Sequence, residues 1–231
     1  MRNILITGAN RGFGLALAKQ ASQQGYQLYL VVRSEKAKQQ LSQTLTGAQV
    51  LVCDITRADY QTQLSQWLGD ATLDVVINNA GSGTRAPSLE STEPEFLRKE
   101  LETNCIAVLA TVKGALAALQ RSSQALVINV SSRRGSLSLQ ANLAAKGSGC
   151  SYSYRISKAA QNMLTLCLAD DLDEFGIALV ALHPGRMLTT MAAKDAHLTA
   201  EQSAQKLLTL IAQNQLKSRE FVCLESGTLP W

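Results

Sequence analysis

A glycine-rich turn near the start of the chain constrains its fold more than any other feature. An apolar run at residues 3–7 indicates a buried strand, and it leads through Gly8, Gly12 and Gly14 into a helical pattern at residues 15–24. Gly8 permits a tight turn, Gly12 lets a pyrophosphate approach the backbone, and Gly14 lets the helix pack on the strand. The same glycines also suit an ordinary strand-to-helix turn. Their setting favours a dinucleotide-binding fold.

Two arginines near this turn bear on the choice of dinucleotide. Rossmann folds selective for NAD carry an acidic residue about 20 positions past the glycine turn, whereas a nearby arginine suits the 2′-phosphate of NADP. Here Arg33 follows the second predicted strand, residues 27–32, and Arg11 lies inside the turn. Either arginine also fits a solvated surface position. Because two guanidinium groups can grip one phosphate, the pair favours NADP(H) over NAD(H).

Strands and helices alternate along the whole chain. Further helical patterns occupy residues 35–45, 58–68, 93–120, 153–175 and 199–214, and the remaining strands are predicted at residues 49–53, 73–77, 125–130, 177–182 and 220–224. Such alternation implies a parallel sheet covered by helices on both faces. We therefore predict one α/β domain over residues 1–231, a doubly wound Rossmann fold with seven parallel strands.

Polar and small residues follow most of the predicted strands. Asp54 ends the third strand, where its carboxylate suits an adenine amino group, a helix cap, or both. The stretch 78–81 (NNAG) follows the fourth strand, Ser131 and Ser132 follow the fifth, and His183 leads into Pro184 and Gly185 after the sixth. Open α/β sheets bind ligands at the carboxyl ends of their strands. These stretches therefore predict one ligand site along a single edge of the sheet.

Tyr154 and Lys158 stand four residues apart at the start of the helix predicted for residues 153–175. Residues at this spacing share one helix face. A neighbouring cation favours the phenolate and lowers the pKa of a tyrosine, which is about 10 in water. Chance pairs of this kind are common, with the tyrosine packed and the lysine solvated. The coincidence with the predicted ligand edge favours an acid–base pair.

Composition and charge argue against several classes of protein. Apolar residues make up 46% and charged residues 17% of the sequence, as in a globular protein, and the net charge of +4 is dispersed. We therefore expect a small-molecule partner, and neither nucleic acid nor a membrane. The five cysteines show no disulfide or metal spacing, and two histidines argue against a multi-histidine metal site. Without a signal peptide before the first strand, a cytoplasmic location is expected.

Taken together, these stretches resemble the short-chain dehydrogenase/reductase family in its small, single-domain type. The resemblance runs through TGANRGFG at 7–14, NNAG at 78–81, Asn104, SSRRG at 131–135, YRISK at 154–158 and PGRMLT at 184–189. Residues 152–160 and the end of the chain also resemble the C-factor and Sniffer-type carbonyl reductase branch. The resemblance implies an NADP(H)-dependent oxidoreductase that interconverts a carbonyl and an alcohol.

The resemblance also implies roles for individual residues. Tyr154 would be the catalytic acid and base, Lys158 would lower its pKa and hold the nicotinamide ribose, and Ser132 would hydrogen-bond the substrate oxygen. Asn104, inside a predicted helix, would hold a water that links Lys158 to solvent. The residues expected at the cofactor, besides Tyr154 and Lys158, are Gly8, Asn10, Arg11, Gly12, Phe13, Gly14, Arg33, Asp54, Ile55, Asn79, Ala80, Gly81, Pro184, Gly185 and Thr189.

The segment between Ser132 and Tyr154 departs from the family pattern. The two residues are 22 positions apart, farther than in many members of the family. Spacing to Gly135 favours Ser132 over its neighbour as the catalytic serine. We predict a polar loop over residues 136–149, made basic by Arg133, Arg134 and Lys146. It is either a surface insertion or a substrate rim that favours a polar or anionic substrate.

Two other functions fit the same fold. One is an NADP-binding sensor or signalling protein without turnover, which needs the glycine turn but not Ser132, Tyr154 and Lys158. The other is a developmental-signal protein that depends on weak reductase activity. The resemblance further implies a homodimer or homotetramer formed by helices 93–120 and 153–175. The small and apolar residues at 115–119 and 163–168 suit such an interface or, equally, the core of the molecule.

Overall fold

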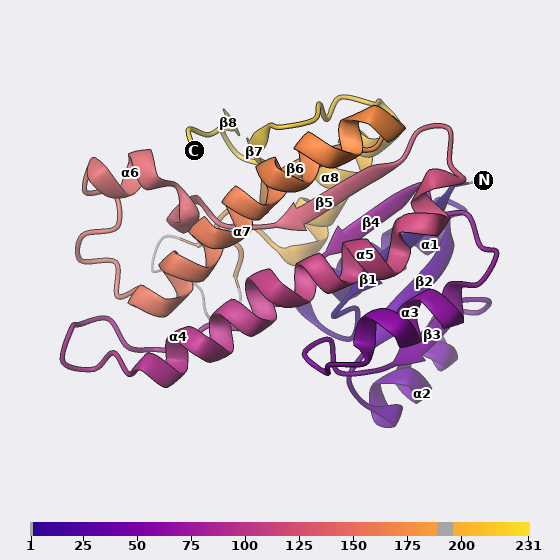
Figure 1. Ribbon diagram of the computed structural model, residues 1–231, viewed down its shortest axis with the longest axis horizontal. Coiled ribbons are helices and arrows are strands. Elements are labelled where there is room, and N and C mark those ends of the chain that lie inside the picture. Colours follow the sequence, from indigo (N-terminus) through magenta and orange to yellow (C-terminus); the bar gives the residue numbers. More distant parts are fainter. Residues whose placement is uncertain (1, 189–195) are drawn as a thin grey trace.

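The fold is built on one eight-stranded sheet, which a computed structural model describes over residues 2–188 and 196–231 (Figure 1). The strands are Asn3–Thr7 (β1), Gln27–Val32 (β2), Gln49–Val52 (β3), Val75–Asn78 (β4), Leu126–Val130 (β5), Ala178–His183 (β6), Phe221–Cys223 (β7) and Gly227–Thr228 (β8). The seven predicted strands pair in parallel, and β8 pairs antiparallel with β7. Strand β8 is not predicted from the sequence, because two residues are too few to show a strand period.

The strand order, β3-β2-β1-β4-β5-β6-β7-β8, reverses between β1 and β4. The chain winds outward from this point in both directions, which is the predicted doubly wound arrangement. Open sheets bind ligands in the crevice at such a reversal, beyond the carboxyl ends of the strands. The glycine turn follows β1 and the NNAG stretch follows β4, so both predicted stretches lie at this crevice.

Helices cover both faces of the sheet (Figure 1). Helices α1 (Gly12–Gln23), α2 (Glu35–Thr44) and α8 (Ala200–Ala212) pack on one face, and α3 (Tyr60–Leu68), α5 (Ala107–Gln120) and α7 (Tyr152–Leu172) pack on the other. Successive residues of a strand point to opposite faces. Ile4 and Ile6 accordingly enter one core and Leu5 the other, all fully buried. Burial on both faces explains the apolar runs of the strands.

The helix predicted for residues 93–120 is continuous but not uniform. It begins as α4 (Pro94–Leu101), widens into a π-helical turn at Glu102–Ile106 and continues as α5. Such turns are frequent at functional sites, and this one holds Asn104. By length and composition alone this helix could cross a membrane, but 44% of its most apolar window is buried within the domain. Its first part packs on α7 and its second part on α3.

The polar segment between β5 and α7 is more ordered than predicted. A 3₁₀ turn at Arg133–Gly135 leads into a short helix, α6 (Leu137–Ala141), which the Ser136 hydroxyl caps. The same hydroxyl donates to the main-chain oxygen of Pro230, 94 positions along the chain. The predicted loop over 136–149 is therefore wrong at residues 137–141. No local pattern reveals a helix whose anchor lies so far away in the sequence.

Candidate active site

The glycine turn closes tightly over the end of β4. Gly8 has a φ of +67° and lies against Ala80, so a side chain there would be both strained and crowded. A Cβ on Gly14 would collide with the carbonyl of Gly8 and with the side-chain amide of Asn79. At Gly12, a Cβ would meet nothing within 4 Å. The turn is therefore compact on its inner side and open at the start of α1.

Asn79 ties this turn to the end of β4. Its Nδ2 donates to the main-chain oxygens of Thr7 at 2.9 Å and Gly8 at 3.1 Å. In return, Oγ1 of Thr7 accepts from the N–H groups of Asn79 at 3.1 Å and Ala80 at 3.0 Å. These bonds hold the two predicted cofactor-binding stretches in one arrangement.

The N-terminus of α1 is open to an anion. Arg11 occupies the N-cap position, no side chain caps the helix, and its first turn contains no acidic residue. The positive end of the helix dipole therefore faces the crevice without a neutralising carboxylate of its own. Asn10 is exposed beside it, whereas Phe13 is buried in the core and anchors the helix.

Arg33 and Asp54 lie close together beyond the ends of β2 and β3. Oδ1 of Asp54 accepts from the N–H of Thr56 at 3.0 Å and from its hydroxyl at 2.8 Å. Burial raises the pKa of Asp54, but these bonds and the charges of Arg33 and Arg57 outweigh it and lower the pKa. Asp54 thus caps the turn after β3, not α3, which begins only at Tyr60. Its neighbour Ile55 is half-buried.

Ser132 and Tyr154 meet beyond the carboxyl end of β5. Tyr154 lies in the first turn of α7, where its N–H donates to the capping hydroxyl of Ser151 at 3.2 Å. Burial raises the pKa of Tyr154 to about 12, although a hydrogen bond with the Ser132 side chain acts in the opposite direction. The lowered pKa predicted from the Tyr–Lys spacing is therefore wrong for this geometry. Tyr154 keeps its proton and is suited to donate it.

Lys158 lies one helical turn beyond Tyr154, with Nζ 5.9 Å from the centre of the tyrosine ring. Nζ donates to the main-chain oxygen of Val130 at 2.8 Å and to Oε1 of Gln161 at 3.0 Å. Only 4% of the residue is exposed. Burial lowers the pKa of Lys158 to about 7, although the charge of Glu100 raises it. A lysine with this pKa gains and loses a proton near neutral pH.

Asn104 is fully buried beside Lys158. Its Nδ2 donates to the main-chain oxygen of Ser82 and to the hydroxyl of Ser157, both at 2.9 Å. Its Oδ1 accepts from the N–H of Ser82, also at 2.9 Å. A Cβ on Gly81 would lie 3.2 Å from this oxygen and 3.8 Å from Nζ of Lys158. Three predicted site residues from three segments of the chain thus converge.

The two serines after β5 have different partners. The hydroxyl of Ser131 donates to Oδ1 of Asn162 at 2.6 Å inside the molecule, whereas Ser132 bonds to Tyr154. A Cβ on Gly135 would collide with the main chain of Lys158. This close packing explains the Ser-x-x-Gly spacing, and the geometry agrees with Ser132 as the serine of the site.

Glu100 and Gln161 belong to this site, yet neither is predicted from the sequence. Glu100 on α4 is 0% exposed, and its Oε1 accepts from the hydroxyl of Ser153 at 3.2 Å. Its Oε2 has no hydrogen-bond partner among the described residues. A glutamate in a helical pattern normally indicates a solvated face. Only the packing of α4 on α7 shows that this one is buried.

The segment after β6 is described only in part. Pro184 and Gly185 are buried, and Gly185, with a φ of +91°, packs against Leu198 and Glu225. Thr189 lies outside the described residues, so its contact with the nicotinamide carboxamide stays a prediction.

His183, Cys223 and Glu225 place three potential metal-ligand atoms within 4.8 Å of one another. Arg186 and His197 already bind the Glu225 carboxylate, each at 3.1 Å. Burial and the charges of nearby arginines together lower the pKa of His183 to about 4, although the charge of Glu225 raises it. Because this positive field opposes a divalent cation, we assign no metal to the group.

Fold and site together define a class of protein. An open helix end and a glycine turn at a topological switch point suit a dinucleotide. Beside them, Ser132, Tyr154 and Lys158 bring a protonated phenol, a hydroxyl and a titratable amine to one edge of the sheet. Groups of these kinds are suited to proton exchange with an oxygen next to a dinucleotide that carries a hydride. The protein is an oxidoreductase that uses a nicotinamide cofactor.

Sequence comparison identifies the family. The chain belongs to the short chain dehydrogenase family, whose model matches residues 2–199. Its relatives include L-fucose dehydrogenase of Oryctolagus cuniculus, 30% identical over 203 residues that cover 87% of this chain and 68% of the relative. They also include C-signal of Myxococcus xanthus, 33% identical over 160 residues that cover 69% of this chain and 93% of the relative.

Solved structures show which members of the family this chain resembles in fold. An NADPH-bound carbonyl reductase from chicken fatty liver has a TM-score of 0.86 and 28% identity, with 100% of this chain and 99% of the other covered. Carbonyl reductase Sniffer of D. melanogaster has a TM-score of 0.86 and 28% identity, with 100% of both chains covered. Together with C-signal, these likenesses confirm the predicted resemblance to the C-factor and Sniffer-type branch.

Proposed function

We propose that this protein is an NADPH-dependent carbonyl reductase in which Tyr154 is the acid. The observation that carries the proposal is the meeting of Ser132 and Tyr154 in front of the buried Lys158. Two similar structures are named carbonyl reductases, and one of them binds NADPH. The substrate is then a small aldehyde or ketone, and the reverse reaction oxidises an alcohol with the same groups.

The residues at the crevice fit the cofactor. The open space at Gly12 and the uncapped start of α1 suit a pyrophosphate. The cramped position of Gly81, where a Cβ would press on Asn104, keeps the floor of the crevice free of side chains. Arg11 and Arg33 are exposed at the adjoining edge, which supports NADPH over NADH. When bound, the cofactor supplies the hydride.

Each polar side chain has one task in the proposed reaction. Tyr154 gives its proton to the carbonyl oxygen, and Ser132 donates a hydrogen bond that stabilises the negative charge developing there. Lys158, oriented by Val130 and Gln161, returns a proton to Tyr154. Asn104 holds the main chain of Ser82 in place next to Lys158. We propose that it also holds a water molecule that links Lys158 to solvent in the proton relay.

The first test replaces Tyr154 by phenylalanine. Because a positioned acid contributes about a hundredfold to ten-thousandfold, we expect Tyr154→Phe to lower kcat by at least about a hundredfold. The measurement is NADPH oxidation against a panel of aldehydes and ketones, with NADH in parallel and L-fucose oxidation as a further arm. Tyr26→Phe is the matched control, because this partly buried tyrosine lies just before β2 at the opposite edge of the sheet.

Cofactor binding separates this proposal from its rival. Titration calorimetry should show that Tyr154→Phe still binds NADPH, because the phosphates bind at the glycine turn and the start of α1, away from the phenol. Turnover by wild type that survives in Tyr154→Phe contradicts the assigned acid. NADPH binding without turnover of any panel member favours the NADP-binding sensor instead.

A further inference from the structure

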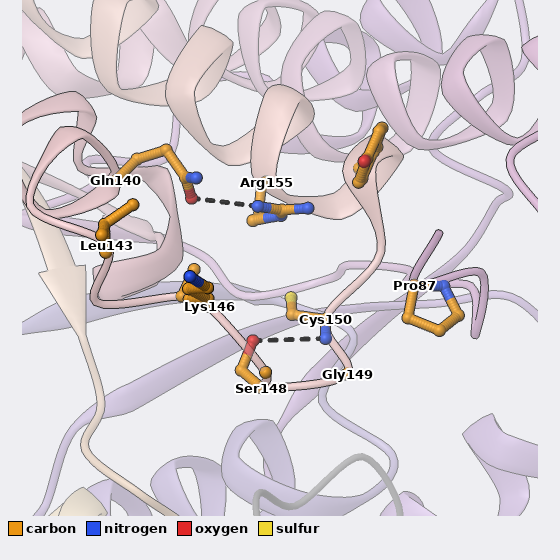
Figure 2. Close-up of a pocket in the computed structure, with 11 residues that line it drawn as sticks. Pro87, Gln140, Leu143, Lys146, Ser148, Gly149, Cys150 and Arg155 are labelled. Atoms are coloured by element: carbon orange, nitrogen blue, oxygen red, sulfur yellow. Dashed lines mark hydrogen bonds between the residues drawn. The ribbon is translucent and has the colours of Figure 1, made fainter. Parts of the chain in front are cut away.

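A hollow of about 360 Å³ lies at the start of α7 (Figure 2). Three segments bound it: Pro87 after β4, residues 140–150 after β5, and the first turn of α7. Figure 2 shows Gln140, Leu143 and Lys146 on one side and Pro87 on the other, with Arg155 and Cys150 between them. All three segments lead away from the carboxyl edge of the sheet, which also carries the proposed active site.

The lining of this hollow is positively charged. Among the described residues it includes Lys146 and Arg155 but no aspartate or glutamate. Ser148 adds a hydroxyl, and Gly147 and Gly149 adopt φ angles of +71° and +69° with open space where a Cβ would stand. Two cations with neutral donors and no competing carboxylate in this lining select an anionic group.

Arg155 is held in place before any ligand arrives. Its Nη1 donates to Oε1 of Gln140 at 3.0 Å and its Nε to the main-chain oxygen of Ser151 at 3.2 Å. The guanidinium carbon lies 4.8 Å from the centre of the Tyr152 ring. A cation that is already oriented loses little further freedom on binding, which favours affinity for an anion.

The cations of the hollow differ from those that the sequence indicates. Of the three basic residues predicted for a substrate rim, only Lys146 lines the hollow. Nη1 of Arg134 instead donates to the main-chain oxygen of Ala144 at 2.6 Å and ties the segment together. Arg155, which lies inside the YRISK stretch, supplies the second charge.

The hollow lies next to Tyr154. Each residue of a helix advances by about 100°, so Tyr154 in the first turn of α7 is about 100° from Arg155 and does not itself line the hollow. Cys150 lines the hollow and is close enough to Tyr154 to act on the pKa of the phenol, although burial is the larger cause. A substrate with its carbonyl oxygen at Tyr154 therefore has its far end within reach of the hollow.

We propose that this hollow binds the carboxylate or phosphate group of the substrate, with Lys146 and Arg155 as its ligands. The inference rests on the proposed carbonyl reductase function and narrows it to aldehydes and ketones that carry an anionic group. A free anion that is not part of the substrate would bind by the same chemistry. The experiment therefore has one arm for the anionic substrate and one for free anions.

The first arm compares 4-carboxybenzaldehyde with its methyl ester, which has the same carbonyl but no charge. In the wild type, kcat/KM should be about tenfold higher for the acid, the size expected of charge-assisted hydrogen bonds. In Lys146→Gln/Arg155→Gln this preference should disappear. Lys113→Gln/Lys217→Gln removes the same charge from exposed positions outside the hollow and should keep it. Equal use of acid and ester by the wild type overturns the substrate assignment.

The second arm measures inorganic phosphate and benzoate binding by calorimetry and needs no turnover. Binding that is lost in Lys146→Gln/Arg155→Gln, but not in the control, supports the anion site even if no carbonyl is reduced. Phosphate binding without preference for the acid substrate shows a site for a free anion and overturns the substrate role. The anion site is overturned if the wild type binds neither anion. The wild type and the double variant are compared at equal thermal stability.

Discussion

Two ionisable side chains of opposite sign are buried in the active site, Lys158 and Glu100. They are 4% and 0% exposed. Burial disfavours the charged form of Lys158 and lowers its pKa, and the charge of Glu100 opposes this. Other titratable groups near Glu100 are Tyr154 and Cys150, whose pKa values are raised chiefly by burial and further by this charge. Glu100 is therefore a positioning residue, which acts through the pKa values of the titratable groups around it.

Glu100→Gln removes this charge and keeps the volume of the side chain. The pKa of Lys158 should then fall below its value of about 7, so that the ammonium form is lost at a lower pH. We expect the basic limb of the kcat profile to move down by about one pH unit, with about a tenfold loss of turnover above neutral pH. The measurement is kcat for carbonyl reduction from about pH 5 to about pH 9.

Two variants control for the loss of a helical glutamate. Glu95→Gln lies on the same helix with a side chain that is 75% exposed, so its profile should match the wild type. Ser153→Ala removes the 3.2 Å hydrogen bond but leaves the Glu100 charge, so its shift should be smaller. An unchanged pH profile in a folded Glu100→Gln protein would contradict the coupling.

At the scale of secondary structure, the π-helical turn at Glu102–Ile106 sets the direction of Asn104. In an α-helix each residue turns the chain by about 100°, so one extra residue in a turn rotates the rest of the helix. The wider turn directs Asn104 to Ser82 and Ser157, while α5 still buries its apolar face against the sheet. The helical pattern of the sequence shows no sign of this widening.

The segment around β8 holds α6 in place. Trp231 stacks on Phe221 with 5.3 Å between ring centroids, and its main-chain oxygen accepts from the N–H and the hydroxyl of Ser138. An aromatic pair contributes about 0.5–1.5 kcal/mol. We therefore expect Trp231→Ala to speed hydrogen exchange at the amides of Ser138 and Leu139 up to about tenfold.

Trp67→Ala is the control for this element. Trp67 makes an edge-to-face contact between α3 and Tyr29 of β2, so its removal should leave exchange in α6 unchanged relative to the rest of the chain. Equal protection of Ser138 in Trp231→Ala and the wild type would show that the stacking does not support α6.

At the scale of the whole molecule, α5, α7 and the turn before α5 carry exposed apolar side chains. Ile106, Leu109, Ile156 and Met163 are 51%, 36%, 46% and 57% exposed, and Figure 1 shows these helices on one side of the sheet. Residues 115–119 contribute chiefly to the core. We propose that this face joins two copies of the chain about a two-fold axis.

Ile106→Lys/Met163→Lys tests this association. Charged side chains are disfavoured in a buried apolar interface, so we expect the wild type to sediment as a dimer and the variant as a monomer at micromolar concentration. Leu89→Lys changes another apolar side chain, 77% exposed between β4 and α4, and should leave the dimer intact. A wild type that sediments as a monomer would rule out this face as a stable interface.

The parallel α/β class, seven of the strands and the edge that carries the site could all be predicted from the sequence. These are local properties: strands buried on both faces appear as apolar runs, helices as a 3.6-residue period, and ligand loops as glycine and polar residues between them. Ser132 was predicted from its place after a strand and Lys158 from its spacing to Tyr154, whereas the role of Asn104, inside a predicted helix, came only from the resemblance to the family.

The packing of the folded chain decided which charged residues are buried and which of them line the hollow. Glu100 is 53 positions from Ser153, and Arg155 gains its role from a segment that Trp231 helps to hold. A glutamate in water and one in the interior have the same local pattern. Their burial, and hence the pKa values around them, depends on contacts between segments far apart in the chain. The pKa of Tyr154 was mispredicted for this reason: spacing reveals its neighbours, but only packing reveals how much water it loses.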